Sequence, residues 1–261
     1  MVLVAGGLTT ALSFLLLGCG GGEQDVLFDS ANAKDVAYAV LPNVGAMPGG
    51  DWKVVSFHRK DKGNPEEDEN DEEERLTSIE AEPACKGLKD RKVLAHLLIG
   101  GGTPDFVGGA HAKFERTSRE SPIKSTIEMH VDIQDSVNQV NAEWKLAKSF
   151  MAQRDFDDCL AAVLVREFEK QESRAEMELT PVPPSGRAPR DGVALAFDMT
   201  VKVGSQVIGL DFESYSWPYG NAEVTVTFSG HAGTVDQDLV SAVLKSLDDK
   251  LVAVEANQQD P

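Results

Sequence analysis

The sequence predicts an α+β fold, an αβα sandwich in which helices flank a mostly antiparallel sheet of about six strands. Three observations predict it. Segments with alternating apolar and polar residues are typical of half-buried strands. Segments with apolar residues at helical spacing lie between these strands and near the C-terminus. The connections in the last third of the chain are too short for parallel crossovers, so those strands must be antiparallel.

Length and composition favour one folded domain. The chain has 261 residues, of which 41 % are hydrophobic and 26 % are charged, as is ordinary for a soluble globular protein. Its two halves show no separate, self-sufficient hydrophobic patterns. We therefore predict a single domain over residues 32–255, followed by a polar tail at 256–261.

The first half of the domain is expected to contain both helices and strands. Ile127, Met129 and Val131 share one face of a strand, because side chains alternate with a period of two. The expected elements are a helix at 33–41, a strand at 52–57, a helix-prone stretch at 85–99, and strands at 109–116 and 124–133 joined by a turn at 118–122.

In the second half, helical spacing returns before a final set of strands. Apolar residues recur at helical spacing from Val137 to Met151 and from Phe156 to Phe168. The closing helix is expected to begin at a capping-box pattern, Thr234-x-x-Gln237. Between these helices we expect a Pro-rich loop at 181–189 and an antiparallel meander of strands at 193–203, 207–217 and 222–228.

The N-terminus has the features of a secretory signal peptide at residues 1–18. Its apolar run, from Val2 to Leu17, carries no charge and is shorter than the roughly 20 residues that span a bilayer as a helix. It ends in Leu16-Leu17-Gly18-Cys19, which resembles the lipobox of bacterial lipoproteins. The resemblance implies cleavage before Cys19, lipidation of its thiol, and a tether at residues 19–31. The alternative is a buried N-terminal helix or strand with a core cysteine.

The other two cysteines, Cys85 and Cys159, form an even pair in a chain that we expect to be exported. Disulfides persist in extracytoplasmic compartments, and a bridge here would close a loop of about 75 residues, worth about 4 kcal/mol. Two buried free thiols, or a redox site, are the alternatives. No Cys-x-x-Cys pattern supports redox chemistry.

The charge of the chain is strongly negative. Forty-three acidic and 25 basic residues leave a formal net charge of −18, which argues against binding nucleic acid through a basic face. Eight of the nine residues at 66–74 carry a carboxyl group, so we expect a solvated acidic loop at 58–76. This loop could bind divalent cations weakly, although it lacks the EF-hand spacing, or serve as an arm for a basic partner.

Short motifs give the chain a resemblance to a known family over residues 33–255. They are Leu41-Pro42, Gly49-Gly50-Asp51-Trp52, Pro83-Ala84-Cys85 and Phe156-Asp157-Asp158-Cys159-Leu160. In order and spacing they resemble the extracytoplasmic sensor-type domain of actinobacterial lipoproteins and receptor Ser/Thr kinases, the PknH-like and PsbP-like family. The resemblance implies an αβα sandwich, a ligand cleft and a Cys85–Cys159 disulfide. The acidic loop and the lack of a kinase segment are departures from that family.

Catalytic and metal-binding motifs are scarce, so we predict no catalytic residues, no metal and no cofactor. There is no Gly-x-Ser-x-Gly elbow, and Gly100-Gly101-Gly102-Thr103-Pro104 lacks the lysine of a phosphate loop. His111 and His130 could meet, with Glu128 beside them, if their two strands pair. Histidines that lie in solvent or accept a hydrogen bond are the commoner outcome on a strand face.

An aromatic turn is the candidate contact patch. It comprises Tyr215, Trp217 and Tyr219, which we expect near the tip of a hairpin, because exposed aromatic rings provide large contact area at small entropic cost. The alternative is that these rings fold back onto the sheet.

Together these features predict a non-catalytic binding or sensing module, anchored by lipid to the extracytoplasmic face of the cell membrane. Its expected partner, besides the membrane, is a small ligand or an envelope protein, and not nucleic acid. The alternatives are an envelope assembly factor that uses the acidic loop, and an envelope hydrolase.

Overall fold

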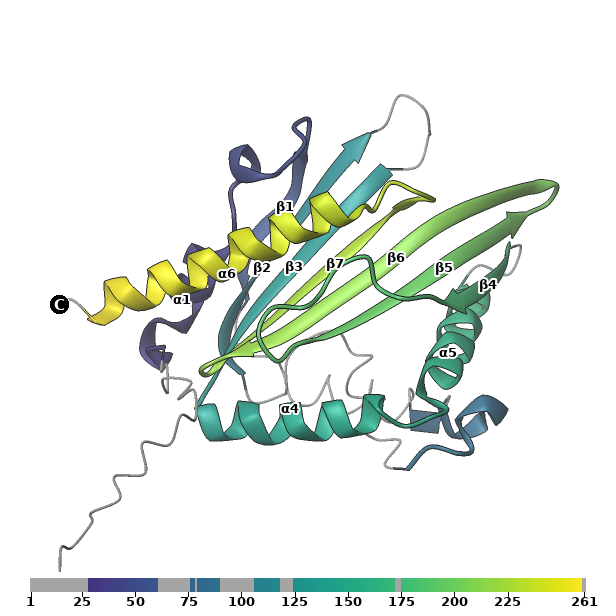
Figure 1. The fold of residues 1–261 in the computed structure, drawn as a ribbon, viewed down its shortest axis with the longest axis horizontal. Coiled ribbons are helices and arrows are strands. Elements are labelled where there is room, and N and C mark those ends of the chain that lie inside the picture. The colour runs from purple at the N-terminus through teal and green to yellow at the C-terminus, as the bar shows by residue number, and fades with distance from the viewer. Residues whose placement is uncertain are drawn as a thin grey trace, which may run out of the picture.

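The computed structural model describes residues 28–60, 76–77, 79–89, 106–117, 124–171 and 175–259. They form one sheet of seven strands in the order β1-β2-β3-β7-β6-β5-β4, in which every neighbouring pair is antiparallel. Helices flank the sheet (Figure 1). The predicted α+β class is confirmed, with one strand more than the approximate count.

The element bounds follow the predicted periodicities closely. The strands are β1 (Lys53–Lys60), β2 (Phe106–Thr117), β3 (Lys124–Gln134), β4 (Ala175–Pro181), β5 (Val193–Val203), β6 (Gln206–Tyr219) and β7 (Ala222–His231). The helices are α1 (Ala33–Val40), α4 (Val137–Met151), α5 (Phe156–Gln171) and α6 (Gln237–Gln259), with 3-10 turns at Ser30–Asn32, Val44–Ala46 and Pro83–Cys85. No helix of the described residues is long and apolar enough to cross a membrane.

The sheet consists of two meanders joined edge to edge. Strands β1, β2 and β3 form the first, and β4, β5, β6 and β7 form the second. The last strand, β7, pairs with β3 from Thr126↔Ser229 to Ile133↔Ala222. Both β3 and β7 therefore lie in the interior of the sheet.

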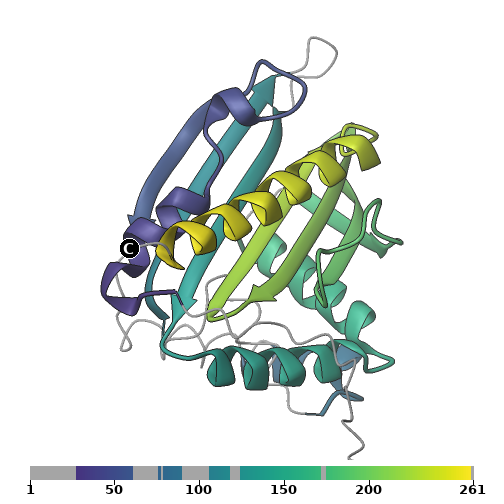
Figure 2. The same cartoon turned by 60° about the vertical axis from the view of Figure 1, so that its left-hand side comes forward.

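Each face of the sheet has its own hydrophobic core. On one face α1 and α6 cover apolar side chains of β3, β6 and β7, and α6 runs diagonally across the strands (Figure 2). The other core lies on the opposite face, at the end of the sheet formed by β4, β5 and β6. It joins α5, the end of α4 and the turn at Pro83–Cys85 to Phe197 of β5.

Strand β4 was not predicted. Ala175, Met177 and Leu179 alternate with exposed polar residues, and the strand pairs with β5 alone at the edge of the sheet. Pro181 ends it without cost to a neighbouring strand, because prolines are tolerated at the edge of a sheet. The alternation is short and runs directly into the Pro-rich loop, so it was not recognised as a strand.

The predicted capping box of the last helix is wrong. Asp236 caps α6, since its carboxylate accepts a hydrogen bond of 2.8 Å from the backbone N–H of Leu239. The Thr234 hydroxyl instead donates to the carbonyl of His231. The helix continues to Gln259, past residue 255, where we expected a polar tail.

The folded domain begins earlier than expected. Phe28 is buried, with 1 % of its surface exposed, and its N–H donates to the side-chain oxygen of Asn221 over 2.6 Å. The Asn221 amide donates in turn to the carbonyls of Phe28 and Gln134. Phe28, which we assigned to the tether, therefore packs against the sheet, whereas residues 29–31 are exposed.

Several predicted features lie outside the described residues. These include the signal peptide, Cys19, the turn at 118–122, most of the helix-prone stretch at 85–99 and nearly all of the acidic loop. Strand β1 extends to Lys60, so residues 58–60 belong to the sheet rather than to that loop.

Candidate functional site

The candidate site lies on the polar face of the first meander. His58, His111 and His130 are in register across β1, β2 and β3. Because side chains alternate along a strand, the side chain of Glu128 shares this face with that of His130. Three neighbouring strands thus present imidazoles side by side, and one of them also contributes a carboxylate.

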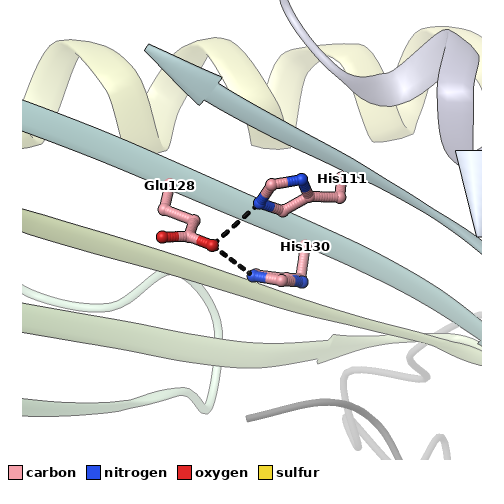
Figure 3. Close-up of side chains that lie close together, drawn as sticks. All are labelled: His111, Glu128 and His130. Carbon is pink, nitrogen blue, oxygen red and sulfur yellow. Dashed lines mark hydrogen bonds and ion pairs between the residues drawn. The ribbon is translucent and has the colours of Figure 1, made fainter. Parts of the chain in front are cut away.

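Glu128 lies between two of the imidazoles. Its Oε1 is 2.8 Å from Nε2 of His111 and 3.4 Å from Nε2 of His130, as Figure 3 shows. The side chains of His111, Glu128 and His130 are 12 %, 35 % and 22 % exposed. The pairing of β2 with β3 therefore brings His111, Glu128 and His130 together, as the sequence analysis required. All three side chains are partly exposed to solvent.

Further polar groups surround this cluster. The Ser56 hydroxyl is 3.3 Å from Nδ1 of His111, and the Lys113 ammonium group is 3.8 Å from Oε2 of Glu128. The His58 ring centroid is 5.0 Å from that of His111. Each oxygen of Glu128 thus has a separate role: Oε1 faces the imidazoles and Oε2 faces the lysine.

The local charges favour a carboxylate beside a neutral imidazole. Burial raises the pKa of Glu128, but the hydrogen bond from His111 and the charges of His130, His111 and Lys113 outweigh it, so the pKa is lowered. Burial, Lys60 and His111 lower the pKa of His130 to about 4, against the opposing effect of Asp132 and Glu128. At neutral pH, Glu128 is ionised and His130 is uncharged.

Hydroxyl groups continue the polar face onto the second meander. Thr225 and Thr227 of β7 lie opposite His130 and Glu128 in register. They pair in turn with serines of β6: Ser216 Oγ is 3.0 Å from Thr225 Oγ1, and Ser214 Oγ is 3.3 Å from Thr227 Oγ1. These hydroxyls form a polar surface beside the cluster.

A partly buried acid lies further along the same face. Glu223 is opposite Asp132 in register and accepts a hydrogen bond of 3.3 Å from the Gln134 amide. Burial and the carboxylates of Glu143 and Asp132 raise the pKa of Glu223 to about 7, against the Gln134 hydrogen bond. Asp132 is paired with Lys60, whose ammonium group lies 2.9 and 3.1 Å from its two oxygens.

Glu223 should make the protein less stable as pH rises from about 4.5 to 7. Its folded-state pKa is above the unfolded value, so over this interval the folded state binds more protons than the unfolded state, and stability falls as the proton is lost. The expected loss is about 3 kcal/mol. Glu223→Gln should flatten this part of a urea-denaturation pH profile. An unchanged profile would contradict the assignment, and Glu178→Gln, at an exposed position of β4, is the control.

The predicted contact patch is wrong. Tyr215 and Trp217 have 0 % and Tyr219 has 4 % of their surface exposed, and all three belong to the core under α6. The Tyr215 hydroxyl donates to Glu213, and that of Tyr219 donates to Glu255 of α6 over 2.5 Å. The rings fold back onto the sheet, which was the alternative interpretation.

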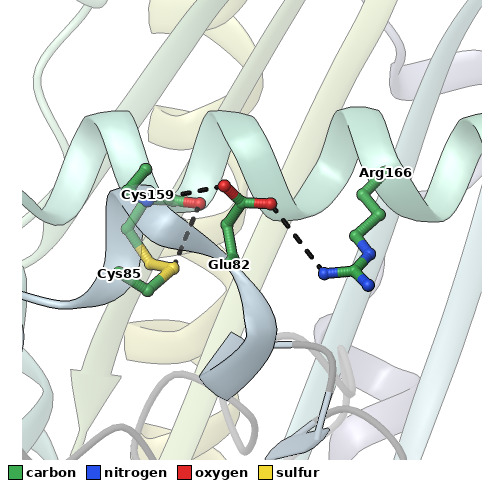
Figure 4. Close-up of a disulfide and its surroundings, with 5 residues drawn as sticks. Glu82, Cys85, Cys159 and Arg166 are labelled. Atoms are coloured by element: carbon green, nitrogen blue, oxygen red, sulfur yellow. Dashed lines mark hydrogen bonds and ion pairs between the residues drawn. A yellow bond between two sulfur atoms is a disulfide. The ribbon is translucent and has the colours of Figure 1, made fainter.

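The cysteine pair forms the predicted disulfide. Cys85 lies in the turn at Pro83–Cys85 and Cys159 lies on α5, with a Cα–Cα distance of 4.7 Å. Figure 4 shows the bridge beside Glu82 and Arg166, whose charged groups are 4.0 Å apart. Both sulfur-bearing residues are fully buried in the second core. The disulfide ties the segment before β2 to α5, the second helix after β3.

A separate groove of about 460 Å³ lies along α6, between that helix and the loop at 185–189. Its lining includes Arg187, Lys245 and Asp248. Since α6 covers the face opposite to that of the imidazoles, this groove is not part of the candidate site.

Comparison with known proteins gives a structural likeness but no match in sequence. No family model and no curated protein matches the chain. Among solved structures, the extracellular domain of PknH from Mycobacterium tuberculosis is similar, with a TM-score of 0.41 and 10 % sequence identity over 83 % of this chain and 97 % of that chain. This TM-score is below the level at which two chains are taken to share a fold.

Proposed function

We propose that this protein is a non-catalytic binding or sensing module, anchored by lipid at Cys19 to the extracytoplasmic face of the cell membrane. Its binding site is the cluster of His111, Glu128 and His130. The observation that carries the proposal is the convergence of two imidazoles on one carboxylate oxygen, at 2.8 and 3.4 Å. Adjacent strands of a continuous sheet hold these groups, which gives the site a rigid support.

Two features support the extracytoplasmic location. The Cys85–Cys159 disulfide is the kind of bond that persists outside the reducing cytosol. The N-terminal apolar run ends in Leu17-Gly18-Cys19, and the described domain starts only nine residues after Cys19, at Phe28. A lipid on Cys19 would therefore hold the sheet close to the membrane surface.

Metabolic labelling with an alkyne fatty acid tests the anchor. The wild-type chain should incorporate the label, and Cys19→Ala should lose it, because the modified thiol is absent. Gly21→Ala, a change in the same segment that keeps the thiol, should label like the wild type. Equal labelling of wild type and Cys19→Ala would refute lipid anchoring at Cys19.

A second candidate function, hydrolysis, is favoured by one observation. Ser56, His111 and Glu128 form a chain of contacts, at 3.3 Å from Oγ to Nδ1 and 2.8 Å from Nε2 to Oε1. Serine nucleophiles are activated by such a chain of base and acid. A fluorophosphonate probe that labels the wild type and not Ser56→Ala would support the hydrolase over the binding module.

A further inference from the structure

We propose that His111, Glu128 and His130 bind a divalent transition-metal ion of the zinc class. The inference rests on the proposed function and names the ligand of the same site. Glu128 and His130 are two residues apart on β3, so both point to one face, and His111 faces them from β2 as the register partner of His130. This arrangement offers three ligand atoms from two adjacent strands.

The distances between these atoms suit a tetrahedral ion. Zinc bonds to imidazole nitrogen and carboxylate oxygen are about 2.0–2.2 Å long, which places two ligands of a tetrahedral site roughly 3.3 Å apart. Glu128 Oε1 is 2.8 Å from His111 Nε2 and 3.4 Å from His130 Nε2. All three ligand atoms lie within 4.8 Å of one another. Small side-chain adjustments are enough to admit the ion.

The ligand types indicate the class of metal. Two imidazoles and one carboxylate suit zinc and its transition-metal neighbours, whereas calcium and magnesium prefer sites made of oxygen. Three protein ligands leave one position of a tetrahedral zinc site for water or a small ligand. The cysteines are joined in a disulfide and do not compete for the ion as thiolates.

The surroundings of His111 support metal binding through its Nε2 atom. A metal-bound histidine usually donates its other ring N–H to a neighbouring group, which fixes the orientation of the ring. The Ser56 hydroxyl is in position to accept from Nδ1 of His111, at 3.3 Å. Lys113 faces Oε2 of Glu128 rather than Oε1, so it leaves the oxygen between the imidazoles accessible to a metal.

Metal binding also requires a proton change at His111. In the metal-free site His111 Nε2–H donates to Glu128 Oε1, and this proton must leave before Nε2 can bind a cation. In a neutral ring the proton moves, by exchange with solvent, from Nε2 to Nδ1, where the Ser56 hydroxyl can accept it in a hydrogen bond; the ring stays neutral and Nε2 is free to bind the cation.

Isothermal titration of zinc chloride into the full chain, kept in mild detergent, tests the site. We expect one ion per chain. Glu128→Gln keeps the shape of the side chain but removes its charge, and His111→Ala removes one ligand. Each should weaken binding by at least about 100-fold, which is the upper end of the effect of losing a supporting residue. Circular dichroism spectra establish that each variant is folded.

His231→Ala is the matched control. His231 lies at the end of β7, outside the three-residue cluster. This variant should bind zinc like the wild type. Cobalt should bind with the visible absorption typical of tetrahedral coordination, and this absorption should disappear in Glu128→Gln.

The outcomes separate this inference from its alternatives. Zinc binding that persists undiminished in the folded cluster variants would overturn it and would place the ion elsewhere, for example on the acidic residues 66–74. No binding by the wild type would also overturn it. The fatty-acid labelling of Cys19 does not depend on the cluster, so failure of the metal site and failure of the anchor can be told apart.

Discussion

Trp217→Ala should lower the free energy of unfolding by about 3–5 kcal/mol, the range for removal of a large aromatic side chain from a core. Trp217 is fully buried under α6 and is among the largest side chains of the core. For a domain of this size the melting temperature should fall by on the order of 10 °C. Thermal unfolding followed by circular dichroism measures it.

Two further variants test whether the loss of stability comes from removing a buried side chain. Val207 lies on the same strand and is 66 % exposed, so Val207→Ala should change the melting temperature little. Trp217→Phe keeps most of the apolar volume and removes an indole N–H that has no hydrogen-bond partner among the described residues. It should cost less than Trp217→Ala. A Trp217→Ala protein as stable as the wild type would refute the buried position.

Replacing both Cys85 and Cys159 with alanine should destabilise the protein by about 4–5 kcal/mol. The two cysteines are 74 residues apart in the sequence, and a cross-link over a loop of this length removes that much entropy from the unfolded chain. Urea denaturation of the wild type and the double variant measures the difference.

Treatment with a reducing agent provides the matching control. It should destabilise the wild type by a similar amount and leave the Cys85→Ala/Cys159→Ala variant unchanged. If the oxidised wild type and the double variant are equally stable, the disulfide does not stabilise the protein by restricting its unfolded chain, and the prediction is wrong.

Periodicity predicted most of the fold. The alternation at 124–133 and the helical spacing at 137–151 depend on residues close in sequence, and both elements appear with nearly the expected bounds. Strand β4 was missed because its alternation spans only seven residues and ends at Pro181. The cap of α6 was misplaced because Asp236 and Thr234 are both good capping residues, and the chain direction before the helix decides between them.

The candidate site depended on register, which periodicity does not determine. His111 and His130 are 19 positions apart, and a shift of one residue between β2 and β3 would turn one of the two imidazoles to the opposite face. The position of His58 beside them depends on a second pairing, in which the register shifts between Val54 and Ser56. The sequence therefore indicated which residues could meet, but not that they do.

The error in the aromatic patch has a specific cause within β6. Leu210 and Phe212 are even-numbered, whereas Tyr215, Trp217 and Tyr219 are odd-numbered, so the apolar face of the strand changes midway along it. Phe212 packs against the core at α5, and Tyr215 belongs to the core at α6. When the apolar residues of a long strand switch from even to odd positions, its two ends pack against cores on opposite faces of the sheet. The sequence of β6 contains this switch.

The pairing of β3 with β7 has a consequence for how the chain folds as it is made. Synthesis proceeds from the N-terminus, and the first meander is complete about 90 residues before β7 follows. Until then β3 has an open hydrogen-bonding edge, and its apolar face, with Ile127, Met129 and Val131, lacks the cover of α6. Contacts between such distant segments form slowly, and unpaired edges invite association with other chains. The nascent protein is therefore most vulnerable to aggregation while its last forty residues are still missing.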